Sequence, residues 1–172
     1  MFAASGWHLA QQQTNAADNN YTFTLNSQKM SSLVGPNGES APAFSGNGAD
    51  RNDPSRTGKV GAGPLPTGLY YVVDRPSGGR AEAMRDMVRG TDRETWFGLF
   101  RADGKIDDYT TVNGVTRGNF RLHPIGPLGI SDGCILVNSL SDFTRIAFQL
   151  MSAKSATIPG TSIRYYGTVT VK

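Results

Sequence analysis

Apolar and polar residues alternate along much of the chain, and this alternation predicts strands. Tyr21, Phe23 and Leu25 are separated by polar residues, which is the two-residue period of a half-buried strand. A short return strand is expected at 30–34. The apolar run 69–73 is rich in β-branched and aromatic residues and suits a central strand. Further strands are predicted at 96–100, 109–112, 115–122 and 162–171.

Hydrophobic residues at helical spacing predict two helices. The stretch 80–89 places apolar residues on one face of a short helix. A second helix follows Asn138, Ser139 or Ser141, each a suitable N-cap, and is expected to end at the Pro-Gly pair at 159–160. Its apolar stripe consists of Phe143, Ile146, Ala147, Leu150 and Met151.

Turn-forming residues separate these elements within one domain. Residues 35–64 are rich in Gly, Pro, Asn and Ser and predict a long ordered loop. The Asn-Gly pair at 113–114 is a hairpin signal, so the sheet is expected to be mostly antiparallel. Residues 1–20 lack periodicity and are expected to form a flexible N-terminal arm ahead of a domain at 21–172. The pattern predicts a mainly β fold, a single β-sandwich domain with about two short helices.

Composition limits the classes of function. The chain has 172 residues, the size of one domain, and its net charge of +3 with 18% charged residues does not favour a nucleic-acid partner. One Cys excludes an intramolecular disulfide, and with two His it supplies too few ligands for a structural zinc site. No cofactor is expected. No apolar run is long enough for a membrane span and the first residues lack a Sec signal, so we expect no membrane insertion and a different export route.

The segment 120–137 holds the candidate chemistry, because it contains His123 and Cys134. Cys134 follows a Ser-Asp-Gly turn and precedes an apolar strand, which puts its thiol at the rim of a sheet beside unpaired amides that suit an oxyanion hole. A neighbouring imidazole lowers a thiol pKa and favours a thiolate–imidazolium pair. The alternatives are an inert, buried Cys134 and a structural His123, while His8 is expected to be solvent-exposed in the arm.

This arrangement resembles a known catalytic signature. In the L,D-transpeptidases of bacterial cell walls, a His is followed after a loop by Ser-His-Gly-Cys and a hydrophobic residue. This chain has His123 and then Ser131-Asp132-Gly133-Cys134-Ile135. The shorter loop and the acidic residue are similar to the type VI secretion L,D-transpeptidase effectors, with a YkuD-type catalytic domain. Three further segments resemble parts of that family. YTFTLNSQKMSSL resembles its opening hairpin, and AFSGNG with RNDP resembles its Gly/Asn loop. GPLPTGLYYV resembles its Pro-Gly turn and strand.

Two positions depart from the general L,D-transpeptidase pattern. Asp132 replaces the second His, and Leu136 stands where many members have Arg or Asn. Asp132 is either a substrate-binding residue or a turn residue that caps its own backbone. The departures leave the choice of substrate more open than the type of reaction.

The resemblance implies a reaction on the tetrapeptide stems of peptidoglycan. Cys134 would attack the carbonyl that joins the third residue, a diamino acid, to the terminal D-alanine, and His123 would act as base and then acid. The backbone N–H groups of Gly133 and Cys134 would stabilise the oxyanion. Ser131, grouped with the catalytic residues, would hold the loop or serve as a turn residue. Arg121 would either meet a stem carboxylate or lie as a solvated surface arginine.

The resemblance also implies a biological setting. Water would resolve the thioester in an L,D-carboxypeptidase, and an amine would give D-amino acid exchange or a crosslink. The protein would be an antibacterial toxin, secreted by a type VI system, that acts in the periplasm of the target bacterium. Its partners would be a cognate immunity protein and spike or tube components. The alternatives are a housekeeping, wall-remodelling L,D-transpeptidase and a non-catalytic peptidoglycan-binding or spike-associated module. A papain-like peptidase is disfavoured because its Cys precedes its His.

Overall fold

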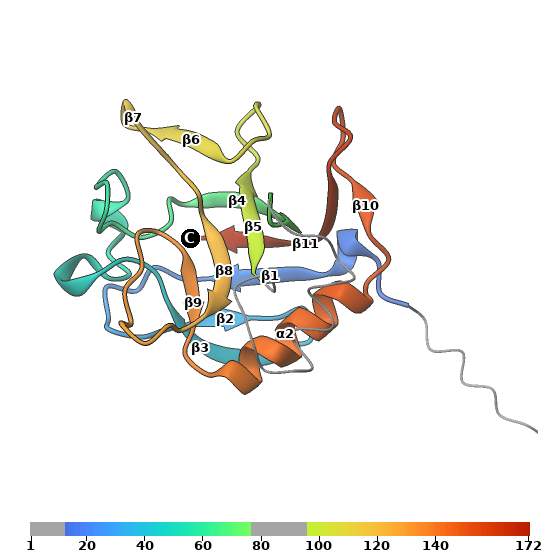
Figure 1. Ribbon diagram of the computed structural model, residues 1–172, viewed down its shortest axis with the longest axis horizontal. Coiled ribbons are helices and arrows are strands. Elements are labelled where there is room, and N and C mark those ends of the chain that lie inside the picture. Colours follow the sequence, from blue (N-terminus) through green and yellow to red (C-terminus); the bar gives the residue numbers. More distant parts are fainter. Residues whose placement is uncertain (1–12, 77–95) are drawn as a thin grey trace, which may run out of the picture.

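The computed structural model describes residues 13–76 and 96–172, in which strands dominate (Figure 1). The predicted mainly β single domain is thereby confirmed. The helix predicted at 80–89 lies outside the described residues, as does His8. The strands are β1 (Asn20–Phe23), β2 (Ser31–Val34), β3 (Ser40–Phe44), β4 (Gly68–Asp74), β5 (Phe97–Arg101), β6 (Tyr109–Val112), β7 (Val115–Gly118), β8 (Arg121–Pro124), β9 (Ile135–Val137), β10 (Ala156–Thr157) and β11 (Arg164–Val171).

The main sheet closes on itself. Its strands follow the order β1-β2-β3-β9-β8-β5-β4-β11, and β11 then pairs in parallel with β1, with Tyr21 opposite Val169. β10 pairs with the start of β11, and β6 and β7 form a separate hairpin. Apart from β1–β11 and β8–β9, the strand pairs are antiparallel, as predicted. The layers of the predicted sandwich are opposite walls of one closed sheet.

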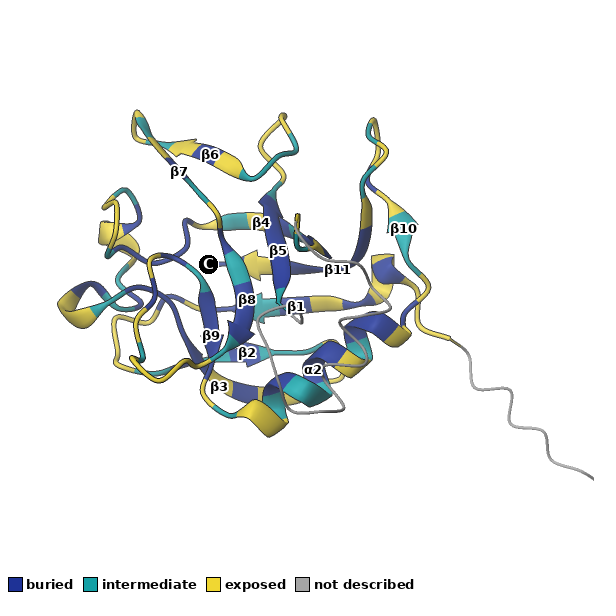
Figure 2. Ribbon diagram, viewed as in Figure 1, coloured by how far each residue is buried: buried dark blue, intermediate teal, exposed yellow. Residues whose placement is uncertain are grey.

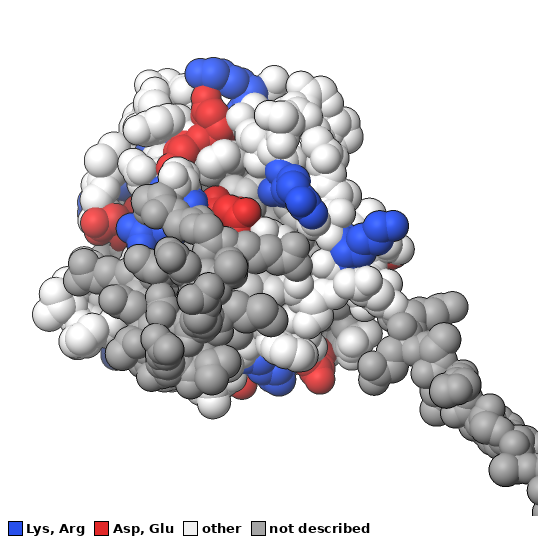
Figure 3. Space-filling view, turned by 45° about the vertical axis from the view of Figure 1, so that its right-hand side comes forward, with Lys and Arg blue, Asp and Glu red and all other residues white. Residues whose placement is uncertain are grey.

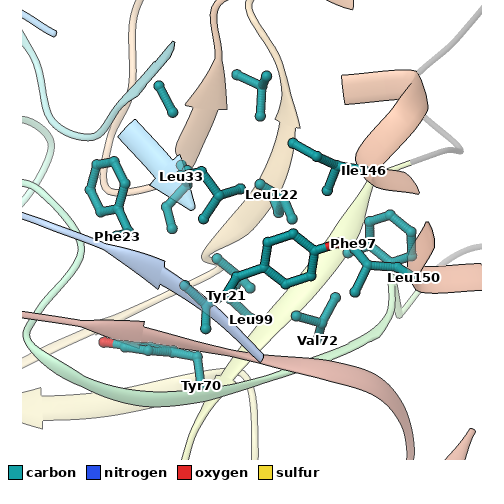
Figure 4. Packing of buried hydrophobic residues seen from close by; sticks show 14 of the residues in the cluster. Tyr21, Phe23, Leu33, Tyr70, Val72, Phe97, Leu99, Leu122, Ile146 and Leu150 are labelled. Atoms are coloured by element: carbon teal, nitrogen blue, oxygen red, sulfur yellow. The ribbon is translucent and has the colours of Figure 1, made fainter. Parts of the chain in front are cut away.

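Aromatic and aliphatic side chains fill the interior of the sheet. Tyr21, Phe97 and Leu122, from three different strands, belong to this core (Figure 4). The helix α2 (Leu140–Ser152) adds its predicted stripe, whose residues Phe143, Ile146, Ala147, Leu150 and Met151 are all buried. Ser139 caps this helix, since its Oγ accepts the N–H of Asp142 at 3.3 Å. Burial of each large side chain contributes about 1.5–3 kcal/mol, so α2 is held mainly by its apolar face.

The long loop predicted at 35–64 is wrong in one part, because residues 40–44 form strand β3. Pro42 is unusual inside a strand, since proline lacks a backbone N–H for a ladder. In the structure Pro42 is exposed and its carbonyl accepts the N–H of Asn138 at 2.8 Å, while Ala41 and Ala43 face the core. The remainder of 35–64 holds two short 3-10 turns, η2 (Gly48–Asp50) and η3 (Pro54–Arg56).

Two predicted boundaries also differ. The strand predicted at 115–122 is divided into β7 and β8, because Asn119 adopts φ 58° and breaks the extended backbone between them. This break lets β8 leave the hairpin and join the main sheet. The helix α2 ends at Ser152, before the predicted end at 159–160, because Ala153 is extended and β10 follows at Ala156.

Part of the predicted N-terminal arm is packed against the domain. The 3-10 turn η1 (Ala16–Asp18) begins with Ala16, which is fully buried and donates its N–H to the carbonyl of Lys154 at 2.9 Å. Asn19 is also buried, and its side-chain amide donates to the carbonyl of Tyr166 at 3.0 Å. Residues 1–12 lie outside the described residues.

The surface separates into a buried framework and exposed loops. Figure 2 shows that β5, β9 and most of β11 are buried, whereas the hairpin β6–β7 mixes exposed and intermediate residues with the buried Thr110 and Arg117. On the face drawn in Figure 3, basic and acidic side chains are interspersed on the described part of the surface. In the described ranges, no helix has both the length and the apolarity to cross a membrane.

Gly167 tests the closure of the sheet. A Cβ at this position would lie 2.4 Å from the carbonyl oxygen of Asn19, at the seam where β1 meets β11. We expect Gly167→Ala to lower the free energy of unfolding by about 1–3 kcal/mol, as overpacking typically does, measured by urea denaturation. Gly126→Ala is the control, since a Cβ there meets nothing within 4 Å. Equal stability of the two variants would contradict the tight seam.

Candidate active site

The parallel pairing of β8 and β9 brings His123 and Cys134 to one pocket. Leu122 lies opposite Ile135 in this register, so the residue before β9, Cys134, lies next to the strand that carries His123. Both side chains line a pocket of about 490 Å³, together with Trp96, Arg117 and other residues of the surrounding loops. The predicted nucleophile and base therefore share one cavity.

His123 is held in one orientation by its two neighbours. Its imidazole stacks on Trp96, with ring centroids 3.8 Å apart and planes 13° from parallel. Its Nδ1 lies 2.8 Å from the carbonyl oxygen of Pro124. A carbonyl oxygen only accepts hydrogen bonds, so Nδ1 carries the proton of the neutral ring and Nε2 keeps a free lone pair. This tautomer suits a general base.

Burial sets the protonation state of His123. The pKa of His123 is lowered to about 4, mainly by its removal from water; the hydrogen bond to Pro124 opposes this shift, and the charge of Arg75 contributes to it. His123 is therefore neutral near pH 7. A neutral imidazole is the form that accepts a proton from a nucleophile.

Burial also favours the neutral form of Cys134. It raises the pKa of the Cys134 thiol, and the backbone N–H and guanidinium of Arg121 offset part of this shift, whereas Asp132 and Asp108 add to it. The thiol contacts the carbonyl oxygen of Asn119, with Sγ 3.8 Å away. The resting pair is a neutral thiol with a neutral imidazole, so the thiolate–imidazolium pair suggested by the sequence is not favoured before substrate binds.

Two buried serines fix the turn that carries the nucleophile. The Oγ of Ser131 donates to the carbonyl of Cys134 at 2.6 Å and accepts the N–H groups of Gly133 and Gly46, each at 3.2 Å. From the other side, the Oγ of Ser45 donates to the carbonyl of Gly133 at 3.2 Å. Ser131 thus holds the loop, which is one of the roles the sequence suggested for it.

Gly133 occupies a position that excludes a side chain. Its φ is 114°, and a Cβ would lie 2.6 Å from both Arg117 Nη2 and Phe120 Cε1. Its N–H, one of the two predicted oxyanion donors, already bonds to Ser131. The oxyanion role predicted for the N–H of Cys134 remains a prediction.

Arg121 and Asp132, the two predicted substrate-binding residues, are placed differently. The guanidinium of Arg121 forms a bidentate ion pair with Asp108, with both N–O distances 2.6 Å, and it also donates to the carbonyl of Phe120. Arg121 is thus neither solvated nor part of the pocket lining. Asp132 is exposed and lines the pocket beside Cys134. The structure brings Asp132, but not Arg121, to the predicted site.

Sequence reasoning missed three residues that shape this site. Trp96, Ser45 and Arg117 contact the base or the nucleophile turn, but each lies in a segment whose local pattern indicated only a strand or a loop. Arg117 stands out because it is a buried arginine in a strand. This burial is seen only in the fold, so the sequence held no signal for it. Within the described ranges, no three His, Cys, Asp or Glu side chains are grouped to hold a metal ion.

Gly133 provides a test of this geometry. We expect Gly133→Ala to displace the turn from Arg117 and Phe120, because its Cβ has no room, and to lower the free energy of unfolding by about 1–3 kcal/mol in urea denaturation. The rate of Cys134 alkylation by iodoacetamide should change with it. Gly58→Ala is the matched control, since its Cβ would meet nothing closer than 3.9 Å. A Gly133→Ala protein with wild-type stability and alkylation rate would contradict the close packing.

Comparison with known families agrees with the motif. The model of the Tlde1 domain matches residues 39–161, which is more than half of the chain and includes every predicted site residue. No curated protein and no solved structure matches the chain. The protein belongs to the Tlde1 domain family, the type VI secretion L,D-transpeptidase effector family that its His-to-Cys segment resembles.

Proposed function

We propose that this protein is an antibacterial effector that cleaves peptidoglycan tetrapeptide stems as a cysteine-dependent L,D-carboxypeptidase, L,D-transpeptidase, or both. The observation that carries the proposal is the shared pocket of Cys134 and His123, in which Nε2 of a neutral imidazole is free to accept a proton. Membership of the Tlde1 domain family supports a cell-wall substrate.

The first half-reaction forms a thioester. The Sγ of Cys134 attacks the carbonyl carbon between the diamino acid and D-alanine, while its proton passes to Nε2 of His123. The carbonyl oxygen takes the negative charge, for which the backbone N–H of Cys134 is the proposed donor. One such donor typically contributes about 3 kcal/mol. The intermediate then collapses, the C–N bond breaks, and the amine of D-alanine leaves with the proton from His123.

The second half-reaction releases the stem. Water or the amine of a D-amino acid attacks the thioester and gives a proton to Nε2, and the proton then returns to the departing sulfur of Cys134. Water yields a tripeptide stem, and a D-amino acid yields an exchanged tetrapeptide. The pocket is also lined by the apolar side chains of Val60 and Ile130, and its volume lies in the range of small-molecule sites.

The setting of this reaction follows from the family. Type VI effectors are secreted, so the proposed place of action is the periplasm of a target bacterium. A producer of such an enzyme needs protection from it, so we propose a cognate immunity protein as one partner. Components of the secretion spike or tube are proposed as the others.

Replacement of the pocket residues tests the reaction. We expect wild-type protein to convert disaccharide-tetrapeptide to tripeptide, or to the D-Met-tetrapeptide when D-Met is added, as measured by mass spectrometry. Cys134→Ala and His123→Ala should each lose at least about 10³-fold in rate, because the nucleophile and base act as a unit. Thr116→Ala, at an exposed position outside the pocket lining, is the control for folding. Unchanged muropeptide with wild-type protein would favour the non-catalytic wall-binding module.

The pH dependence of alkylation tests the neutral resting pair. A raised pKa means that the thiolate forms only above the ordinary thiol value of about 8.5. We therefore expect the iodoacetamide rate of Cys134 to rise in a single step centred above this value. A thiolate–imidazolium pair would instead hold a constant rate from about pH 5 to 8, and such a plateau would contradict the assignment.

A further inference from the structure

Arg117 ties the nucleophile turn to the loop on the opposite side of the pocket. It is the third residue of β7, and it is 5% exposed. Nη1 donates to the carbonyls of Thr57 and Pro64, and Nη2 donates to those of Gly63, at 2.8 Å, and Asp132, at 3.0 Å. One guanidinium thus joins residues 57–64 to the residue two positions before Cys134.

The charge of Arg117 has no carboxylate partner. All four acceptors are backbone carbonyls, and no ion pair of the described residues includes it. Arg121, by contrast, is paired with Asp108, and these two charges act on the pKa of Cys134 in opposite directions. Burying a cation without a counter-ion is unfavourable, and hydrogen bonds to carbonyls alone would not require a permanent charge at this position.

The position of this charge matches the chemistry of the pocket. Arg117 supplies the one cationic side chain among the described residues that line the cavity, and Cys134 lines the same cavity. Burial lowers the pKa of Arg117, and attraction to Tyr70, Asp132 and Cys134 in their charged forms opposes this shift. Attraction between charges is mutual, so the charge of Arg117 favours a thiolate at Cys134, in addition to Arg121, the cation that lowers the pKa of the Cys134 thiol.

We propose that Arg117 is the positioning residue of the nucleophile turn, with an unpaired charge that stabilises the negative charge formed on Cys134 and on the oxyanion. The oxyanion part rests on the proposed function, whereas the thiolate part does not. All four terminal N–H groups are used by protein carbonyls, so they are not available to a substrate carboxylate. Arg117 acts by holding the turn in place and through the electric field of its charge.

Two variants separate the charge of Arg117 from its shape. Arg117→Gln removes the charge, and Arg117→Lys keeps it but lacks the planar fork that reaches four carbonyls. Arg164→Gln is the control, since it removes an exposed positive charge on β11. The measurements are the midpoint of the pH dependence of Cys134 alkylation, kcat and KM on disaccharide-tetrapeptide, and the thermal midpoint.

We expect Arg117→Gln to raise the alkylation midpoint by at least about 0.5 pH units and to lower kcat more than tenfold with little change in KM. Arg117→Lys should retain the wild-type midpoint and lose part of kcat, because the turn is held less firmly. A purely structural role would change the thermal midpoint of both variants but leave the alkylation midpoint unmoved. A folded Arg117→Gln protein with the alkylation midpoint of the wild type would overturn the proposal.

A measurement on wild-type protein covers the case in which Arg117→Gln does not fold. An unpaired positive charge beside Cys134 favours an anionic reagent, so the rate ratio of iodoacetate to iodoacetamide should be higher in the folded protein than in the urea-unfolded chain. An equal or lower ratio would overturn the proposal. Alkylation needs no peptidoglycan, so a wild-type protein that is inactive on muropeptides but shows these effects would refute the proposed function alone.

Discussion

The turn at 131–134 carries the nucleophile, and the backbone polar groups that it buries need protein partners. Ser131 satisfies the N–H of Gly133 and the carbonyl of Cys134, Ser45 satisfies the carbonyl of Gly133, and Arg117 satisfies the carbonyl of Asp132. Each partner comes from a different part of the chain. The closed sheet matters to the site because it brings these parts together at one end of β8 and β9.

Local patterns predicted the elements whose residues face a core on one side. The alternation around Tyr21 and the stripe from Phe143 to Met151 were correct because burial repeats with the period of the strand or helix. The strand β3 was missed because Pro42 is tolerated there through its exposed position and its carbonyl alone. The break at Asn119 was missed because a single left-handed residue inside the predicted strand 115–122 does not change the hydrophobic pattern on either side of it.

The candidate site was predictable as far as it is local in sequence. His123 and Cys134 lie in one short segment, and their order and spacing indicated the family that the Tlde1 domain match then showed. The partners of that segment are far away in the chain, and Ser45 and Arg117 have no local feature that marks them. The predicted role of Arg121 depended on a free guanidinium, and Asp108, which pairs with it, lies on the loop before β6.

The same burial that shapes the pocket explains why both reactive groups rest in their neutral forms. Desolvation disfavours the imidazolium of His123 and the thiolate of Cys134 alike, so neither gains from the other until a proton moves between them. A substrate that fills the pocket excludes further water and strengthens every remaining charge interaction. Arg117 is already in place and held by four carbonyls, so it needs no reorganisation when negative charge forms. Burial of the Arg117 charge lowers the free energy of unfolding, whereas the stabilisation that the charge provides arises only when negative charge forms during the reaction.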